Sequence, residues 1–423
     1  MRPRILLAFI ILGVVALVAL LPTPEPAPAE NANSFVLGPV HIFNGEEVIQ
    51  AQYIEVTQGV IRQLYDTVPT TDLPIIDGQQ KWLMPGLIDA HVHAWGDALE
   101  QQLARGITTV VDMFGQPSFL NQRKAQREGT QFSKEADIFG AGILVTAPHG
   151  HGTQFGIPVP TFTKPEQATE QIQQRLLQGS DFIKIVYTTA SASYPHAPSI
   201  SFDVLEASIA AAHTQQKLAV VHIADHASAQ EAVAAGADGL VHSFFDQEIS
   251  PELLQAMRAN QVFVIPTMAV YEGMLQGTSN EALLFSNTDL PISTTAKITL
   301  NQRFDNNMPA AFWQHLLHNT QAMYAAGIPV LAGSDAPNPN TAHGWSLIVE
   351  LMLMEQAGMP AAAVLASATS APARAFQLPQ RGRIQVGYKA DMLLLDHSPL
   401  EQLAGLLTPT QIWKSGFAVK AGH

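Results

Sequence analysis

The chain has 423 residues, of which 47% are apolar and 14% charged, so it can bury a large core and is not disordered as a whole. The 36 Asp and Glu residues outnumber the 22 Lys and Arg residues, and the net charge of −14 argues against nucleic acid as a main partner. Cysteine is absent, which excludes disulfides, thiolate catalysis and iron–sulfur clusters.

The first 30 residues have the pattern of an export segment. Arg2 and Arg4 precede an apolar run from Ile5 to Leu21, and Ala27-Pro28-Ala29 offers the small residues of a cleavage site. We therefore predict that residues 1–30 are a signal peptide and that the protein is exported, to the periplasm or the outside. The alternative is an uncleaved membrane anchor, since the length of the apolar run is at the lower limit for spanning a bilayer. This segment would then be the only membrane contact that the sequence predicts.

Strand-rich stretches occupy both ends of the remaining chain. They are rich in β-branched residues and are broken by turn sequences such as Gly38-Pro39 and Asn44-Gly45. The predicted strands are Phe35–Phe43, Val48–Val56, Val60–Tyr65, Gly382–Ile384, Ala390–Asp396 and Ile412–Val419. We predict that residues 31–84 and 380–423 together form one small antiparallel β-sandwich.

Between these ends, residues 85–379 alternate between short apolar runs and helical stretches rich in Ala, Gln, Glu and Leu. The apolar runs are Leu87–His93, Thr108–Phe114, Asp137–Thr146, Asp181–Tyr187, Leu218–Ile223, Gly239–Phe245, Val262–Met268 and Pro329–Asp335. Strand–helix alternation repeated eight times is typical of a closed (β/α)8 TIM barrel, so we assign the chain to the α/β class. An open doubly wound sheet is the rival fold, but the first run is not followed by a glycine-rich phosphate turn.

In a barrel of this kind, functional residues gather at the carboxyl ends of the strands. The first run ends as Asp89-Ala90-His91-Val92-His93, which directs two imidazoles to one side because alternate residues of a strand share a face. His222 and His242 follow the fifth and sixth runs, and Asp335 ends the eighth. Because imidazole and carboxylate are common zinc ligands, we predict a metal site, which manganese or iron would also satisfy.

Lys184 lies among apolar residues in the fourth run. Burial lowers the pKa of an ammonium group and makes the neutral amine available, and a neutral amine can take up carbon dioxide as a carbamate. The alternative is a lysine whose stem packs while its ammonium reaches solvent or a carboxylate. As a carbamate, Lys184 would bridge two cations, whose other ligands would be His91, His93 and Asp335 on one side and His222 and His242 on the other.

Further residues near the strand ends are candidates for binding the substrate. His149 and His151 follow the third run in a glycine-rich loop and would stabilise an oxyanion or hold the substrate, unless the loop is simply exposed. Tyr187 ends the fourth run and is a candidate hydrogen-bond donor to a tetrahedral oxygen, with packing as the alternative. His343 follows the eighth run and is a similar candidate. The stretch Ala269–Asn307 exceeds an ordinary connection and is predicted to be a lid or specificity element.

These motifs resemble those of the amidohydrolase superfamily from about residue 35 to the end of the chain. The matching segments are Met84–His93, the lysine of Asp181–Ile185, His222, His242 and Gly333–Ala336. Gly150-His151-Gly152 and Thr341–Gly344 make the chain similar to the imidazolonepropionase-like and dipeptidase-like branch. The resemblance implies metal-dependent hydrolysis of an amide or ester-like bond, and it favours the carbamylated form of Lys184.

We therefore predict a hydrolase that cleaves a C–N amide bond in a small peptide-like or N-acyl substrate. A metal-bridging hydroxide would attack the carbonyl, and Asp335 would pass the proton to the leaving group. The predicted cofactors are two divalent ions, zinc by ligand type, bridged by carbamylated Lys184. The alternatives are a single-metal enzyme that hydrolyses a cyclic amide or deaminates its substrate, and a barrel that only binds a ligand. The sequence leaves the oligomeric state open, a homo-oligomer included.

Overall fold

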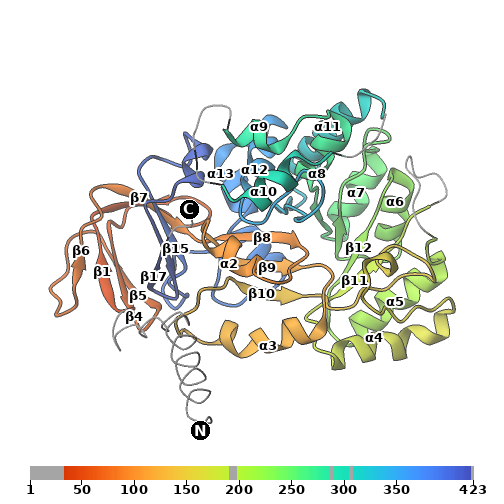
Figure 1. Cartoon of the computed structure of the whole chain (residues 1–423), viewed down its shortest axis with the longest axis horizontal. Coiled ribbons are helices and arrows are strands. Elements are labelled where there is room, and N and C mark those ends of the chain that lie inside the picture. The colour runs from red at the N-terminus through yellow and green to blue at the C-terminus, as the bar shows by residue number, and fades with distance from the viewer. Residues whose placement is uncertain (1–32, 190–197, 286–289, 291, 304–307, 421–423) are drawn as a thin grey trace, which may run out of the picture. The chain divides into compact units, whose positions relative to one another are not determined.

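The computed structural model describes residues 33–189, 198–285, 290, 292–303 and 308–420. The predicted export segment, residues 1–30, lies outside the described residues. Residues Asn33–His423 form one compact unit of the α/β class (Figure 1). Within the described ranges, no helix combines the length and the apolar character that crossing a bilayer requires.

The compact unit begins and ends with strands and alternates strands with helices between them. The described strands are β1 Phe35–Leu37, β2 Val40–Phe43, β3 Val48–Ile49, β4 Tyr53–Thr57, β5 Val60–Tyr65, β6 Ile75–Ile76, β7 Lys81–Pro85, β8 Leu87–Val92, β9 Ile107–Asp112, β10 Asp137–Gly140, β11 Ile183–Val186, β12 Ala219–His222, β13 Gly239–Val241, β14 Phe263–Ile265, β15 Met392–Leu395, β16 Gln411–Lys414 and β17 Phe417–Val419. The described helices are α2 Ala98–Leu103, α3 Pro117–Glu128, α4 Ala168–Leu177, α5 Phe202–Thr214, α6 His226–Ala234, α7 Pro251–Ala259, α8 Met268–Leu275, α9 Asn280–Phe285, α10 Thr294–Asn301, α11 Ala311–Ala325, α12 Ser346–Gln356, α13 Ala361–Ser367 and α14 Ser370–Ala375, with short 3-10 helices η1 Thr153–Phe155, η2 Pro165–Gln167 and η3 Leu403–Leu407.

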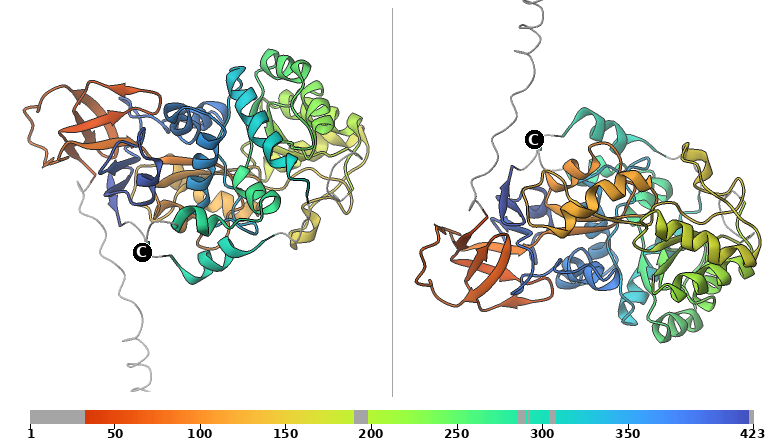
Figure 2. Two further views of the ribbon diagram at one scale, coloured as in Figure 1. Left: turned by 90° about the horizontal axis from the view of Figure 1, so that it is seen from above. Right: turned by 90° about the horizontal axis from the view of Figure 1, so that it is seen from below.

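Strands from the two ends of the chain lie side by side (Figures 1 and 2). One sheet has the order β5-β4-β1-β6, and the other has the order β17-β16-β15-β7-β2-β3. Leu37 and Ile54 from the N-terminal strands share an apolar core with Met392 and Trp413 from the C-terminal strands.

The pairing within these two sheets is mixed rather than purely antiparallel as the sequence analysis predicted. β1 pairs with β6, and β2 with β7, in parallel. Parallel neighbours need a long connection, and more than a dozen residues separate the strands of each pair. The predicted strand Gly382–Ile384 is irregular chain instead, and a Cβ on Gly382 would lie 2.3 Å from the carbonyl oxygen of Thr369.

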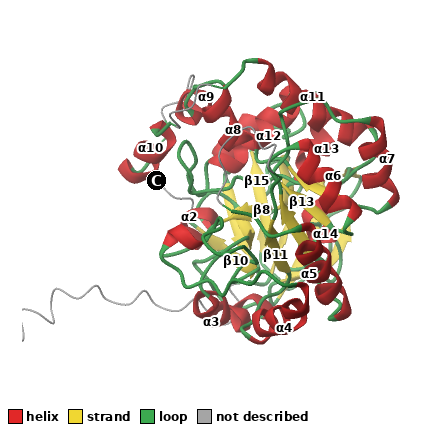
Figure 3. Cartoon of the chain, turned by 90° about the vertical axis from the view of Figure 1, so that its right-hand side faces the viewer, coloured by secondary structure: helices red, strands yellow, loops and turns green. Residues whose placement is uncertain are grey.

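Two parallel sheets occupy the centre of the helical part and are surrounded by helices (Figure 3). Their strand orders are β10-β9-β8 and β11-β12-β13-β14, and these strands lie within or next to seven of the eight predicted runs. The isolated bridge Val145↔Ile185 continues the ladder on the outer side of β11. The central structure is therefore two parallel sheets with further local pairing, not one continuous assigned barrel.

The eighth predicted run, Pro329–Asp335, is not assigned as a strand. It pairs through the isolated parallel bridges Val264↔Val330 and Val92↔Ala336. At the end of the run, Asp335 has a left-handed backbone with φ of 52°, outside the range of an extended strand. The run nevertheless lies between β14 and β8, where it completes the edge that carries the candidate site.

Close packing holds the eighth run against β8. A Cβ on Gly333 would lie 2.7 Å from Cβ of His91, a separation that real side chains do not reach, so glycine is required there. The Asp335 amide donates to the His91 carbonyl at 2.8 Å. The carboxylate of Asp89 accepts hydrogen bonds from the amide and the hydroxyl of Ser334, at 2.9 and 2.6 Å. These contacts set Asp335 beside the two histidines of the first run.

Candidate metal centre

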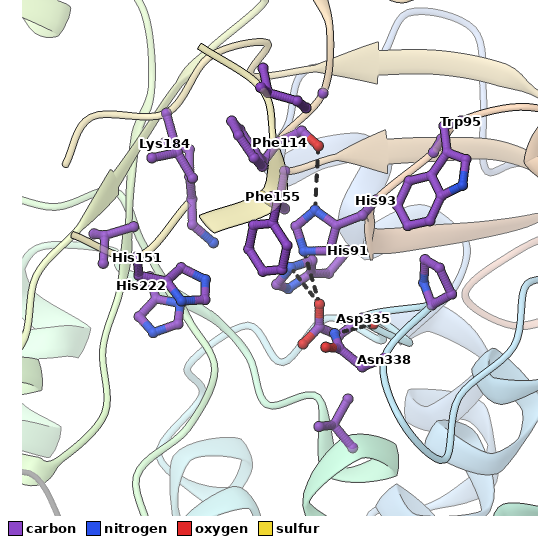
Figure 4. Close-up of a pocket in the computed structure, with 18 of the residues that line it drawn as sticks. His91, His93, Trp95, Phe114, His151, Phe155, Lys184, His222, Asp335 and Asn338 are labelled. Carbon is purple, nitrogen blue, oxygen red and sulfur yellow. Dashed lines mark hydrogen bonds and ion pairs between the residues drawn. The ribbon is translucent and has the colours of Figure 1, made fainter. Parts of the chain in front are cut away.

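Two histidines and one carboxylate meet where β8 and the eighth run end (Figure 4). Nε2 of His91 lies 3.2 Å from Oδ1 of Asp335, and Nε2 of His93 lies 3.1 Å from the same oxygen. One ligand atom from each of the three residues lies within 4.8 Å of the other two, as ligands of a single cation do. His91 and Asp335 are buried, whereas a quarter of the His93 side chain is exposed.

The hydrogen bonding of this group is incomplete without a cation. Within the described part of the chain, Nδ1 of His91 has no hydrogen-bond partner, and Nε2 of His91 and Oδ1 of Asp335 have only each other and His93 within reach. Buried polar atoms cost free energy unless they are paired or coordinate a metal. Burial, together with the charge of Lys184, holds the pKa of His91 well below its usual value, so this ring is neutral and offers a lone pair. The residues present therefore fit a divalent cation.

Two of the histidines are oriented through Nδ1, so that Nε2 is directed elsewhere. Nδ1 of His93 lies 3.4 Å from the carbonyl oxygen of Phe114, and Nδ1 of His242 lies 2.7 Å from the hydroxyl oxygen of Thr267. A partner on one ring nitrogen is how proteins select the tautomer and aim the other nitrogen at a metal. Burial lowers the pKa of His93, but the hydrogen bond and charge of Asp335 and the charge of Asp112 raise it above its usual value.

The remaining predicted ligands lie next to this group. The rings of His222, which ends β12, and His242, which follows β13, have centroids 4.5 Å apart, and the rings of His91 and His242 are 5.0 Å apart. Lys184 on β11 is 3% exposed and points toward the same space (Figure 4). Burial lowers the pKa of Lys184 to about 7, although the charge of Asp335 acts in the opposite direction. A substantial fraction of this amine is thus neutral near neutral pH.

All six predicted ligand residues line one cavity of about 730 Å³. His151 also lines it, and its ring centroid lies 5.0 Å from that of His222. From the predicted lid stretch, α8 contributes Val270, Tyr271 and Met274 to the wall, and the rings of Tyr271 and His242 are 6.0 Å apart. The volume suits a small organic molecule.

Three predicted substrate-binding residues are not among those that line the cavity. The hydroxyl of Tyr187 donates to the Glu231 carboxylate on α6. Burial, and after it this hydrogen bond, raise the pKa of Tyr187. His343 is buried, with Nδ1 lying 3.2 Å from Nε2 of Gln102, and burial lowers its pKa to about 4. His149 is exposed, with a positive φ of 59°.

Supporting residues that the sequence analysis did not single out lie behind the candidate ligands. Asp112 ends β9 and accepts a hydrogen bond from the Ala94 amide at 2.8 Å, which fixes the chain directly after His93. Asp89 accepts from the His91 amide at 3.2 Å. Burial raises the pKa of both carboxyls to about 6. Asp89 was visible as the first residue of the Asp-Ala-His-Val-His motif, whereas Asp112 and Thr267 carry no sequence signal of their own.

Comparison with known proteins agrees with the nature of this site. The model of the amidohydrolase family matches residues 82–421. The chain is 24% identical to an ochratoxinase from Aspergillus niger, over 92% of this chain and 83% of that protein. It is 25% identical to an imidazolonepropionase from Pseudoalteromonas atlantica, over 86% and 89% of the two chains. Among solved structures, a putative prolidase from Bifidobacterium longum superposes with a TM-score of 0.74 at 24% identity, over 92% and 95% of the two chains.

Fold, site and comparisons define a hydrolase. The family model covers most of the chain, and the chain therefore belongs to the amidohydrolase family. It is an amidohydrolase enzyme that acts on amide C–N bonds of small molecules, rather than a barrel that only binds a ligand.

Proposed function

We propose that this enzyme hydrolyses a C–N amide bond in a small N-acyl or peptide-like molecule, using two divalent cations. His91, His93 and Asp335 would hold one cation, His222 and His242 would hold the other, and Lys184 would bridge them. The observation that carries the proposal is that these six side chains line one cavity, where His91, His93 and Asp335 each place a ligand atom within 4.8 Å of the other two. Zinc is the proposed metal because imidazole nitrogens dominate the ligand set.

Lys184 would bridge as a carbamate. The neutral amine attacks the carbon of carbon dioxide, an N–C bond forms, one C=O electron pair moves to oxygen, and Nζ releases a proton. The product carries one negative charge shared by two oxygens, which would suit it to hold two cations. The burial that lowers the pKa of Lys184 to about 7 supports this step, because only the unprotonated amine reacts.

The protein's own residues would carry the proton and hold the substrate. Cations bound here would supply a water activated at neutral pH and would polarise the scissile carbonyl. Asp335 would accept the proton of that water at a carboxylate oxygen and return it to the leaving nitrogen. His151 lies at the cavity wall beside His222, where its ring would contact the oxygen that gains charge.

We further propose that the two central parallel sheets and the eighth run belong to one (β/α)8 barrel, residues 85–379, and that residues 31–84 and 380–423 are its split β-sandwich. The bridges Val92↔Ala336, Val145↔Ile185 and Val264↔Val330 support this arrangement. Export through residues 1–30 is likewise a proposal.

Metal analysis combined with a substrate screen tests the proposed function. Purified enzyme would be loaded with zinc and offered a library of N-acyl amino acids, anilides and dipeptides, with a chelator-treated control. We expect amide cleavage that is lost with the chelator and returns with added zinc. Activity that survives complete metal removal would contradict the proposal, and full activity with one equivalent of metal would favour the single-metal alternative.

A further inference from the structure

Apart from the candidate ligands, most of the residues that line the cavity in front of the metal centre are apolar. Phe114, Leu144, Val186 and the partly buried Ile157 form one apolar cluster on one side. Val270, Tyr271 and Met274 of α8 contribute further wall residues. Two large aromatic side chains also line it, Trp95 at 60% and Phe155 at 58% exposure. The substrate that fills this space therefore presents apolar or aromatic surface.

Apart from histidine, cationic side chains that would bind a carboxylate are scarce on the walls that the described residues form. Among the described residues, no arginine lines the cavity, and Lys184 is the one lysine that does. The internal segments outside the described residues, 190–197, 286–289, 291 and 304–307, contain neither lysine nor arginine. If Lys184 is the bridging carbamate of the proposed function, it is an anion and offers no positive charge to a substrate.

Two of the neutral hydrogen-bond donors at the cavity are engaged with the protein. The side-chain amide of Asn338 donates to the Asp335 carbonyl at 2.7 Å. At the start of α3, the Gly115 amide donates to the Gly142 carbonyl at 3.0 Å, and Pro117 has no N–H. A substrate carboxylate held against these walls would exchange its hydration for apolar contacts and neutral donors such as the exposed Gln116 side chain, which is unfavourable for an anion. The net charge of −14 adds a field that repels anions from the molecule.

We propose that the substrate is an uncharged amide, with an apolar or aromatic group on the amine side of the scissile bond and no carboxylate there. A free dipeptide or N-acyl amino acid carries a carboxylate on that side and is disfavoured. This inference rests on the proposed function for the bond cleaved, and it names the substrate class of the same site. The specificity determinants are the walls, Phe114 and Leu144 in one cluster and Tyr271 and Met274 of α8.

A matched pair of substrates tests the inference. N-(2-phenylethyl)benzamide and N-benzoyl-L-phenylalanine differ only in the carboxylate, and cleavage of either releases an amine that fluorescamine detects. For the zinc-loaded full chain, we expect kcat/KM at least about tenfold higher for the uncharged amide, since the unpaired carboxylate must lose its hydration. Equal or better turnover of the acid would overturn the inference and leave amide hydrolysis standing.

Two variants of equal charge show whether the walls set the preference. Met274→Arg adds a guanidinium to the cavity wall, and it should shift the kcat/KM ratio toward the acid by at least about tenfold. Leu177→Arg adds the same charge on α4 at a side chain that is 73% exposed and outside the cavity lining, and it should leave the ratio unchanged. An unchanged ratio in Met274→Arg, or the same shift in both variants, would contradict the inference.

Binding separates this inference from the proposed function. If neither compound is cleaved, the proposed function fails for this bond, and calorimetric titration of the zinc-loaded enzyme still compares the two ligands. A dissociation constant at least about tenfold lower for the uncharged amide would support the inference. Equal affinity, tighter binding of the acid, or no measurable binding of the amide would overturn it.

Discussion

Thr267 links the end of β14 to the metal centre, and replacing it with valine tests whether His242 is a positioned ligand. The Thr267 side chain is fully buried, and its hydroxyl oxygen lies 2.7 Å from Nδ1 of His242. Valine keeps the shape of threonine but removes the hydroxyl, so His242 loses the partner that aims Nε2. Losing such an orienting contact to a metal-binding histidine lowers metal affinity by about 10–100-fold. Losing the hydrogen bond to the buried Nδ1 should also lower the folding stability by about 1–3 kcal/mol.

The assay is a competition between the enzyme and a fluorescent zinc chelator, with urea unfolding of the metal-free protein as the stability readout. In Thr267→Val one zinc should bind about 10–100-fold more weakly while the other is retained. Thr267→Ser keeps the hydroxyl and should restore most of the affinity.

Thr369→Val is the matched control for this experiment. Thr369 is also fully buried, and its hydroxyl donates to the Leu365 carbonyl at 2.8 Å, outside the cavity. It should lose stability without losing zinc. If Thr267→Val binds both zinc ions as tightly as the unaltered enzyme, the reasoning about His242 is refuted.

Three further predictions concern the proton carrier, pH and the N-terminus. Asp335→Asn should lower kcat by about 10²–10⁴-fold, because an amide cannot carry the proton to the leaving group. Steady-state kinetics at saturating zinc measures this effect, and an unaltered kcat would refute the role of Asp335. Burial raises the pKa of Glu350 from 4.5 to about 8, so between these two pH values the folded protein holds a proton that the unfolded chain releases. In that range, folding stability should therefore fall as the pH rises, by up to about 1.4 kcal/mol per pH unit. Glu350→Gln should remove that part of the pH dependence in urea midpoints of the metal-free protein, and an identical pH profile speaks against it. Intact-mass analysis of the exported protein should give a chain that lacks the apolar run and begins just after Ala27-Pro28-Ala29, whereas a mass that includes Met1 supports the anchor.

The candidate ligands could be predicted from sequence because the carboxyl ends of parallel strands meet at one edge of the structure. Applied to the types of residue at the predicted strand ends, that rule groups His91, Lys184 and Asp335 from the sequence alone. The same rule does not decide where a side chain points once the strand has ended. Tyr187 directly follows β11, yet its hydroxyl reaches Glu231 on α6, a contact that depends on how a helix packs.

Other features escaped the sequence because they arise from packing between distant segments. The apolar character of Pro329–Asp335 predicted a regular strand, but the run pairs through isolated bridges, with Gly333 packed closely against His91 and a left-handed backbone at Asp335. The cavity wall combines Phe114 with residues of α8 more than 150 positions later, and no local pattern relates them. Thr267 is a single threonine, and its role emerges only from its distance to His242.

Anomalous X-ray diffraction at the zinc edge, on crystals of the zinc-loaded enzyme grown with bicarbonate, tests the central claim most directly. Our account predicts two anomalous peaks, one beside His91, His93 and Asp335 and one beside His222 and His242, with density for a carboxylate on Lys184 between them. In Lys184→Ala one or both peaks should disappear and nearly all activity should be lost, while the fold is retained. A single peak beside an unmodified Lys184, or full activity in Lys184→Ala, would contradict the two-metal centre.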